Sequence, residues 1–127
     1  MSEAKKILIC DDDPAILAAV GLMLSKTFEV IKSSSGSEAV RLAAQHKDIE
    51  LVIMDYNMPG MRGDETTMEI ALMPHNKDML FILLSAIDAV KAKEIQRTIG
   101  AAVFLPKPFD KKTLLTTIVR LMQRKKK

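Results

Sequence analysis

Hydrophobic and polar residues follow two alternating patterns along this chain. Short apolar runs of strand length lie at 6–10, 28–31, 51–54, 79–84 and 102–105. Between and after them, apolar residues recur every three or four positions, which is the spacing of one helix face. These helical stretches cover 13–24, 35–43, 64–73, 88–99 and 110–124. The pattern predicts five strands that alternate with five helices.

Two of the predicted helices carry clear start signals. Asp13 stands before Pro14, so the aspartate can cap the helix while the proline occupies its first position. Ser35 and Glu38 match a capping box, in which the serine caps and the glutamate reaches back to the helix start. Each signal places the start of a helix a few residues after an apolar strand.

The alternation itself indicates the fold class. Strands that alternate with helices are typical of an α/β fold with a parallel sheet. The strand runs are apolar throughout, which fits a sheet that helices cover on both faces. Right-handed crossovers leave few topologies, and the most economical is a doubly wound, flavodoxin-like sheet of order 2-1-3-4-5 with five helices. The length of 127 residues fits one domain over 1–127.

Composition narrows the cellular setting. With 48% hydrophobic and 28% charged residues, the chain can bury one packed core. No apolar run approaches the roughly 20 residues that span a bilayer, and residues 1–6 lack the apolar segment of a signal peptide. The single cysteine, Cys10, rules out an internal disulfide and suits a reducing compartment. We therefore expect a cytoplasmic protein that does not associate with membranes.

The net charge of +3 comes from the C-terminal end of the chain. Residues 124–127 are all basic, which leaves the rest of the chain slightly acidic. This distribution argues against direct binding of nucleic acid. The basic tail can instead complement the dipole at the end of the last helix, or it can begin a linker to a further domain.

Acidic residues follow two strands that the predicted topology makes neighbours. Asp11 and Asp12 come after the first strand, and Asp55 comes directly after the third. In open α/β sheets, ligands bind at the carboxyl ends of the strands where the strand order reverses, which here lies between strands one and three. Like charges this close repel, so the cluster needs a cation. Oxygen ligands suit magnesium or manganese better than zinc, and the main-chain carbonyl of Asn57 can join them.

Two further strand ends bring polar groups to the same edge. Ser85 ends the fourth strand, and Lys107 with Pro108 follows the fifth. A metal ion, an ammonium group and a hydroxyl group are together the kinds of group that stabilise a phosphoryl group during transfer. A carboxylate in that setting can act as a nucleophile and become an acyl phosphate. Asp55 is the best candidate because it lies centrally, on an interior strand.

Taken together, these motifs resemble the receiver domain of two-component response regulators, over about residues 5–122. The resemblance rests on Asp11-Asp12, Asp55 followed by Tyr56-Asn57-Met58-Pro59-Gly60, Ser85-Ala86, and Lys107-Pro108-Phe109. Each motif is weak alone, but their order at successive strand ends is specific.

The resemblance implies a phosphorylation site and a metal. Asp55 would receive a phosphoryl group from a histidine kinase or a histidine phosphotransfer protein. Magnesium would be held by Asp11 or Asp12, together with Asp55 and the Asn57 carbonyl. The chain would then be a signalling switch rather than an enzyme with a separate substrate.

The resemblance also implies a switch mechanism. Ser85 and Lys107 would contact the phosphoryl oxygens, and Phe104 occupies the aromatic switch position. Movement of Ser85 toward the phosphoryl group would open space that Phe104 fills. The face formed by strand five and its flanking helices would then bind a downstream protein or a second copy of the chain. Phenylalanine stands where the family often has tyrosine, so the coupling must depend on ring packing without a phenolic hydroxyl.

Two rival functions have distinct signatures. An aspartate-based phosphatase uses a second aspartate two residues after its nucleophile as an acid, but Asn57 occupies that position here and cannot give a proton. A receiver-like domain that binds partners without being phosphorylated needs no complete site, whereas all five positions (Asp11, Asp12, Asp55, Ser85, Lys107) hold suitable residue types. The phosphorylated switch is therefore the function that the sequence favours.

Overall fold

A computed structural model of the chain describes residues 5–56, 63–76, 79–85, 93, 102–106 and 109–125. In this part of the chain, five strands form one sheet: β1 (Lys6–Cys10), β2 (Glu29–Ser33), β3 (Ile49–Asp55), β4 (Leu80–Ser85) and β5 (Ala102–Pro106). Their order is β2-β1-β3-β4-β5, and every neighbouring pair is parallel. The predicted strand order is confirmed.

The described residues form four α-helices and one turn of 3-10 helix. The helices are α1 (Pro14–Leu24), α2 (Gly36–Gln45), α3 (Gly63–Ala71) and α5 (Lys111–Lys125), and the 3-10 turn is η1 (Pro74–Asn76). The prediction of five helices is therefore confirmed for four of them. The remaining predicted helix, expected over 88–99, lies outside the described residues apart from Lys93.

Both predicted helix starts are present, and one differs in detail. The carboxylate of Asp13 accepts a hydrogen bond from the Ala15 N–H at 2.9 Å. The hydroxyl of Ser35 accepts one from the Glu38 N–H at 3.2 Å. In a capping box, Glu38 would accept from the N–H of the cap residue itself. Here it accepts from the N–H of Ser34, one residue earlier, at 2.8 Å.

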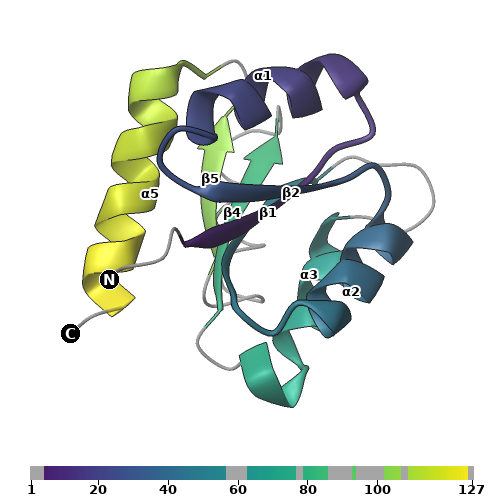
Figure 1. The fold of residues 1–127 in the computed structure, drawn as a ribbon. Helices are drawn as coiled ribbons and strands as arrows, with labels where there is room; N and C mark the ends of the chain where they lie inside the picture. Colours follow the sequence, from purple (N-terminus) through teal and green to yellow (C-terminus); the bar gives the residue numbers. More distant parts are fainter. Residues whose placement is uncertain are drawn as a thin grey trace.

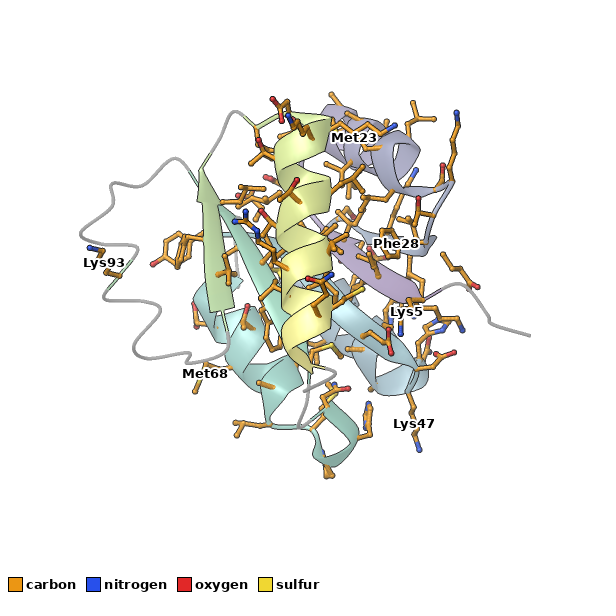
Figure 2. All side chains as sticks on the ribbon, turned by 90° about the vertical axis from the view of Figure 1, so that its left-hand side faces the viewer. Lys5, Met23, Phe28, Lys47, Met68 and Lys93 are labelled. Carbon is orange, nitrogen blue, oxygen red and sulfur yellow. The ribbon has the colours of Figure 1, made fainter. Side chains whose placement is uncertain are left out.

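Helices cover both faces of the sheet, as the continuously apolar strands predicted. Figure 1 shows α1 and α5 on one side and α2 and α3 on the other. In Figure 2, Met23 and Phe28 lie on the α1 side, whereas Met68 projects from α3. Successive strand residues point to opposite faces, so the core divides into two clusters. The first includes Ile9, Ile53, Leu84 and Ile118, and the second includes Leu8, Met54, Leu83 and Ile70.

The last helix buries one stripe and exposes another. Leu114, Ile118 and Leu121 are buried against the sheet, whereas Val119 on the same helix is 47% exposed. Lys111, Lys112 and Arg120 are exposed as well. Among the described residues, no helix is long and apolar enough to cross a membrane.

The amino ends of three strands are joined by ion pairs. Lys6 on β1 lies 2.7 Å from Asp48 and 3.8 Å from Glu29, measured between the charged atoms. Its neighbour Lys5 lies 3.1 Å from Glu50. Because β1 has β2 on one side and β3 on the other, these pairs tie all three strands together at this edge.

Candidate functional site

The three aspartates that the sequence singles out meet at the opposite, carboxyl edge of the sheet. Asp11 follows β1 and Asp55 is the last residue of β3, and β1 and β3 are neighbours. One carboxylate oxygen from each of Asp11, Asp12 and Asp55 lies within 4.8 Å of the other two. Asp11 is fully buried, Asp55 is 5% exposed and Asp12 is exposed. The cluster therefore opens to solvent on one side.

Backbone hydrogen bonds hold the residues of this cluster in place. The Asp11 N–H donates to the Ser33 carbonyl at 3.1 Å, which ties the end of β1 to β2. The Asp11 carboxylate accepts from the Asp13 N–H at 2.9 Å. On β3, the Tyr56 N–H donates to the Leu84 carbonyl at 2.9 Å, so pairing with β4 continues past Asp55. The carboxylates are consequently carried by ordered strand ends.

The donor set and its dimensions suit one hard divalent cation. All three groups offer oxygen, the ligand that magnesium prefers, and their negative charges would be offset by the ion. In octahedral magnesium coordination, two opposite oxygens lie about 4.2 Å apart. A spread of at most 4.8 Å therefore needs only small side-chain adjustments to close on one ion. The fourth predicted ligand, the Asn57 carbonyl, lies outside the described residues.

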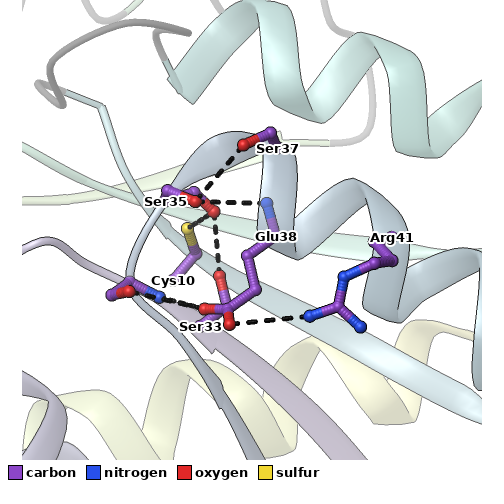
Figure 3. A network of polar contacts seen from close by, with 7 residues as sticks. Cys10, Ser33, Ser35, Ser37, Glu38 and Arg41 are labelled. Atoms are coloured by element: carbon purple, nitrogen blue, oxygen red, sulfur yellow. Dashed lines mark hydrogen bonds and ion pairs between the residues drawn. The ribbon is translucent and has the colours of Figure 1, made fainter.

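Cys10 lies beside the acidic cluster and belongs to a polar network at the ends of β1 and β2 (Figure 3). Its thiol donates to the Ser35 carbonyl at 3.2 Å. The pKa of the Cys10 thiol is raised to about 11, mainly by burial and to a smaller extent by the charges of Asp11 and Asp55, against a hydrogen bond with Ser33 that lowers it. The cysteine is therefore a neutral, buried residue at neutral pH, in line with a structural role.

The network continues outward through the helix cap. The Glu38 carboxylate that accepts from the backbone before α2 also lies 3.6 Å from the Arg41 guanidinium. This places a paired glutamate at the start of α2, outside the group of three aspartates.

The remaining predicted site residues come from the ends of β4 and β5. Ser85 is the last residue of β4 and is in register with Pro106; the position of its side chain is not described. Lys107 lies outside the described residues. Phe104 lies on β5 in register with Leu83, half-buried against the α2 and α3 side of the sheet.

Tyr56 is a site neighbour to which the sequence reasoning gave no role. It directly follows Asp55, is 7% exposed, and its ring centroid lies 6.4 Å from that of Phe104, with the ring planes at 54°. One sequence feature could have drawn attention to it: it is the only tyrosine in the chain and adjoins the predicted phosphoacceptor.

Solved structures with this architecture include chemotaxis and receiver proteins. The chemotaxis protein CheY4 of Vibrio cholerae superimposes with a TM-score of 0.88 at 29% identity, over 94% of this chain and 99% of that one. A CheY-like receiver domain protein from Methanospirillum hungatei has the same TM-score at 24% identity and covers 98% of each chain. At that identity, the second match bears on the fold alone.

Sequence relatives give the same assignment. Protein PilH of Pseudomonas aeruginosa is 34% identical over 114 residues, which cover 89% of this chain and 93% of PilH. The cell cycle response regulator CtrA of Brucella ovis is 30% identical over 122 residues, and the chain spans only 51% of its length. The sequence pattern of the response regulator receiver domain matches residues 7–119. The chain therefore belongs to the response regulator receiver domain family, whose members are switches in two-component signalling.

Proposed function

We propose that this chain is a phosphorylation switch whose acceptor is Asp55. The observation that carries the proposal is the meeting of three carboxylates within 4.8 Å at the carboxyl ends of β1 and β3. Asp55 is the central one, 5% exposed, at the end of an interior strand. Membership of the receiver family supports the same assignment.

The proposed reaction is transfer of a phosphoryl group between two side chains. A carboxylate oxygen of Asp55 attacks the phosphorus of a phosphohistidine on a partner protein. The new oxygen–phosphorus bond forms as the phosphorus–nitrogen bond breaks, and its electron pair remains on the imidazole nitrogen. The donor would be a histidine kinase or a histidine phosphotransfer protein, because both present phosphohistidine.

Asp11, Asp12 and Asp55, with the carbonyl of Asn57, would hold magnesium. When bound, the ion would offset the negative charge of the carboxylates and of the incoming phosphoryl group. Manganese has the same preference for oxygen ligands.

Ser85 and Lys107 complete the proposed site. The lysine would pair with a phosphoryl oxygen, and the serine hydroxyl would donate to another. Phe104, half-buried on β5, would then settle inward as Ser85 moves.

The face formed by β5 and α5 would change with Phe104 and bind a downstream protein or a second copy of the chain. Exposed Val119 with the basic residues of α5 gives that face both apolar and charged contacts. Because the chain spans about half of CtrA, we expect such outputs to differ between members of the family.

The first test is the mass of the intact protein after incubation with acetyl phosphate, with and without magnesium. We expect one phosphoryl adduct on the wild type in the presence of magnesium and none on Asp55→Asn. The matched control is Asp48→Asn, which removes a carboxylate at the opposite edge of the sheet, where Asp48 pairs with Lys6. This control should take up phosphate like the wild type.

Two results would contradict the proposal in different ways. An adduct on Asp55→Asn at the wild-type rate would mean that another residue accepts the group. A folded wild type that binds magnesium but forms no adduct would instead indicate a binding module that works through its unmodified surface.

A further inference from the structure

We propose that Tyr56 is a positioning residue that couples the phosphoacceptor to the β5 surface through its contact with Phe104. This inference rests on the proposed function of Asp55. It adds a connection that runs from β3 to β5 through two aromatic rings, beside the proposed movement of Ser85.

The distance between the rings shows that they reach toward each other across a strand. Tyr56 follows β3 and Phe104 lies on β5, with β4 between them. Neighbouring strands are about 4.8 Å apart, so β3 and β5 are separated by about 10 Å. The ring centroids are only 6.4 Å apart. Both side chains therefore lean over β4, near its carboxyl end.

The tilt of the rings matches a favourable aromatic contact. Aromatic pairs prefer tilted or offset arrangements with centroids between roughly 4.5 and 7 Å. The pair here has an interplanar angle of 54° and a separation inside that range. A shift of either ring changes the distance and the angle together, so displacement of one ring favours displacement of the other.

The backbone connects Tyr56 tightly to the acceptor. It is the next residue after Asp55, and its N–H donates to the Leu84 carbonyl at 2.9 Å. At 7% exposure, its ring has no room to swing into solvent without leaving the core. A rearrangement of the Asp55 peptide on phosphorylation is consequently passed to the Tyr56 ring. Phe104 is only half-buried, so its ring has more room to shift than that of Tyr56.

The competing interpretation is that Tyr56 only fills space at the edge of the core. Two substitutions separate the interpretations. Tyr56→Phe keeps the ring and loses the hydroxyl, whereas Tyr56→Leu keeps an apolar side chain and loses the ring. Space filling alone predicts that Tyr56→Leu loses stability but keeps the response of Phe104 to loading, whereas coupling through ring packing predicts that only Tyr56→Phe keeps this response.

The experiment follows Phe104 by fluorine NMR in protein labelled with fluorophenylalanine. The chain has four phenylalanines, and the Phe104 signal is assigned by its loss in Phe104→Leu. Spectra are taken with magnesium, before and after addition of beryllium fluoride as a phosphoryl analogue. We expect the Phe104 signal to shift on loading in the wild type and in Tyr56→Phe. In Tyr56→Leu, loading should proceed but most of that shift should disappear.

A second readout does not depend on the stability of Tyr56→Leu. The chain has one tyrosine and no tryptophan, so its ultraviolet emission reports Tyr56 alone. Loading should change this emission in the wild type, and Phe104→Leu should reduce the change. An unaltered Phe104 shift in folded, loaded Tyr56→Leu would overturn the coupling. An unaltered emission response in Phe104→Leu would overturn it as well.

Failure of the proposed function is recognised separately. If the wild type forms no adduct with acetyl phosphate and shows no spectral response to beryllium fluoride, the acceptor assignment falls and the coupling falls with it. If the adduct forms and the Phe104 signal does not respond in the wild type, the acceptor assignment stands, but the coupling through Tyr56 and the proposed movement of Phe104 are both wrong.

Discussion

The two edges of the same sheet carry opposite arrangements of charged residues. At the amino edge, Lys6 lies between Asp48 and Glu29, and Lys5 pairs with Glu50. At the carboxyl edge, three carboxylates lie within 4.8 Å of one another. The first arrangement offsets charge between neighbouring strands, and the second concentrates charge of one sign.

We interpret the amino edge as structural and the carboxyl edge as the proposed site of phosphorylation. Exposed ion pairs contribute little to stability, but they also cost little. A buried cluster of like charges is unfavourable unless something offsets it, so its presence needs a functional reason. In this chain the reason is the proposed binding of a cation and a phosphoryl group.

The largest effect on stability is expected when an aspartate is replaced by asparagine at each edge of the sheet in turn. Two carboxylates whose oxygens lie within 4.8 Å of each other repel by roughly 3.5 kcal/mol or more at an effective dielectric constant of about 20. Without metal, Asp55→Asn should therefore raise the free energy of unfolding by about 2–3 kcal/mol, measured with urea. Asp48→Asn should lower it slightly, because it removes the nearer of the two carboxylates that pair with Lys6.

Magnesium should reverse the order of stability of the wild type and Asp55→Asn. Binding to the folded state stabilises the wild type by mass action, whereas Asp55→Asn loses a ligand and should respond less. Asp48→Asn should respond like the wild type. If Asp55→Asn were less stable than the metal-free wild type, like-charge repulsion would not dominate this edge.

A smaller effect is expected on the alkaline side, through Cys10. Burial raises the pKa of its thiol from 9.0 to about 11, so the folded state holds this proton more tightly than the unfolded state. The stabilisation is complete below pH 9.0 and is lost as the pH rises toward 11. Near pH 11, this loss should lower the free energy of unfolding by about 2 kcal/mol. Cys10→Ala should lack this part of the decline in stability at alkaline pH.

The thiol also reports the field of the carboxyl edge. Because Asp55 contributes to the raised pKa of Cys10, Asp55→Asn should lower that pKa, measured by the ultraviolet absorbance of the thiolate. Asp48→Asn, at the far edge, serves as the control and should leave it unchanged. If both substitutions changed the pKa of Cys10 equally, the effect of the Asp55 charge on this pKa would not depend on its proximity.

The smallest effect is expected on the acid side, at the amino edge. A hydrogen bond from Lys6 is the main cause that lowers the pKa of Asp48 below its ordinary value of 3.8. A depressed pKa stabilises the folded state above that value, and the stabilisation is lost as the pH falls through the folded pKa. Lys6→Met should reduce this acid sensitivity in urea unfolding at low salt. Added salt should reduce it in the wild type as well.

Asp110 provides a control for that measurement. Its pKa is lowered by the backbone N–H of Thr113, which lies 2.7 Å from its carboxylate at the start of α5. Lys6→Met should leave this contribution intact, so some acid sensitivity should remain. Complete loss of the acid decline in Lys6→Met would contradict the assignment to two separate groups.

The sequence by itself determined the strand order and the edge of the sheet at which Asp11, Asp12 and Asp55 meet. These features follow from local information: hydrophobic periodicity, the caps at Asp13 and Ser35, and the rule that parallel strands end at one edge. The meeting of Asp11, Asp12 and Asp55 followed from that topology. Their roles, and those of Asn57, Ser85 and Lys107, stay predictions.

Only the tertiary structure decided which side chains touch. The Lys6 ion pairs, the exposure of Val119 and the contact of Tyr56 with Phe104 depend on the register of strands and on the packing of helices over them. Tyr56 and Phe104 are far apart in sequence and separated by a strand in space. No local sequence pattern predicts their contact, because the two rings meet across β4 only once the sheet has folded.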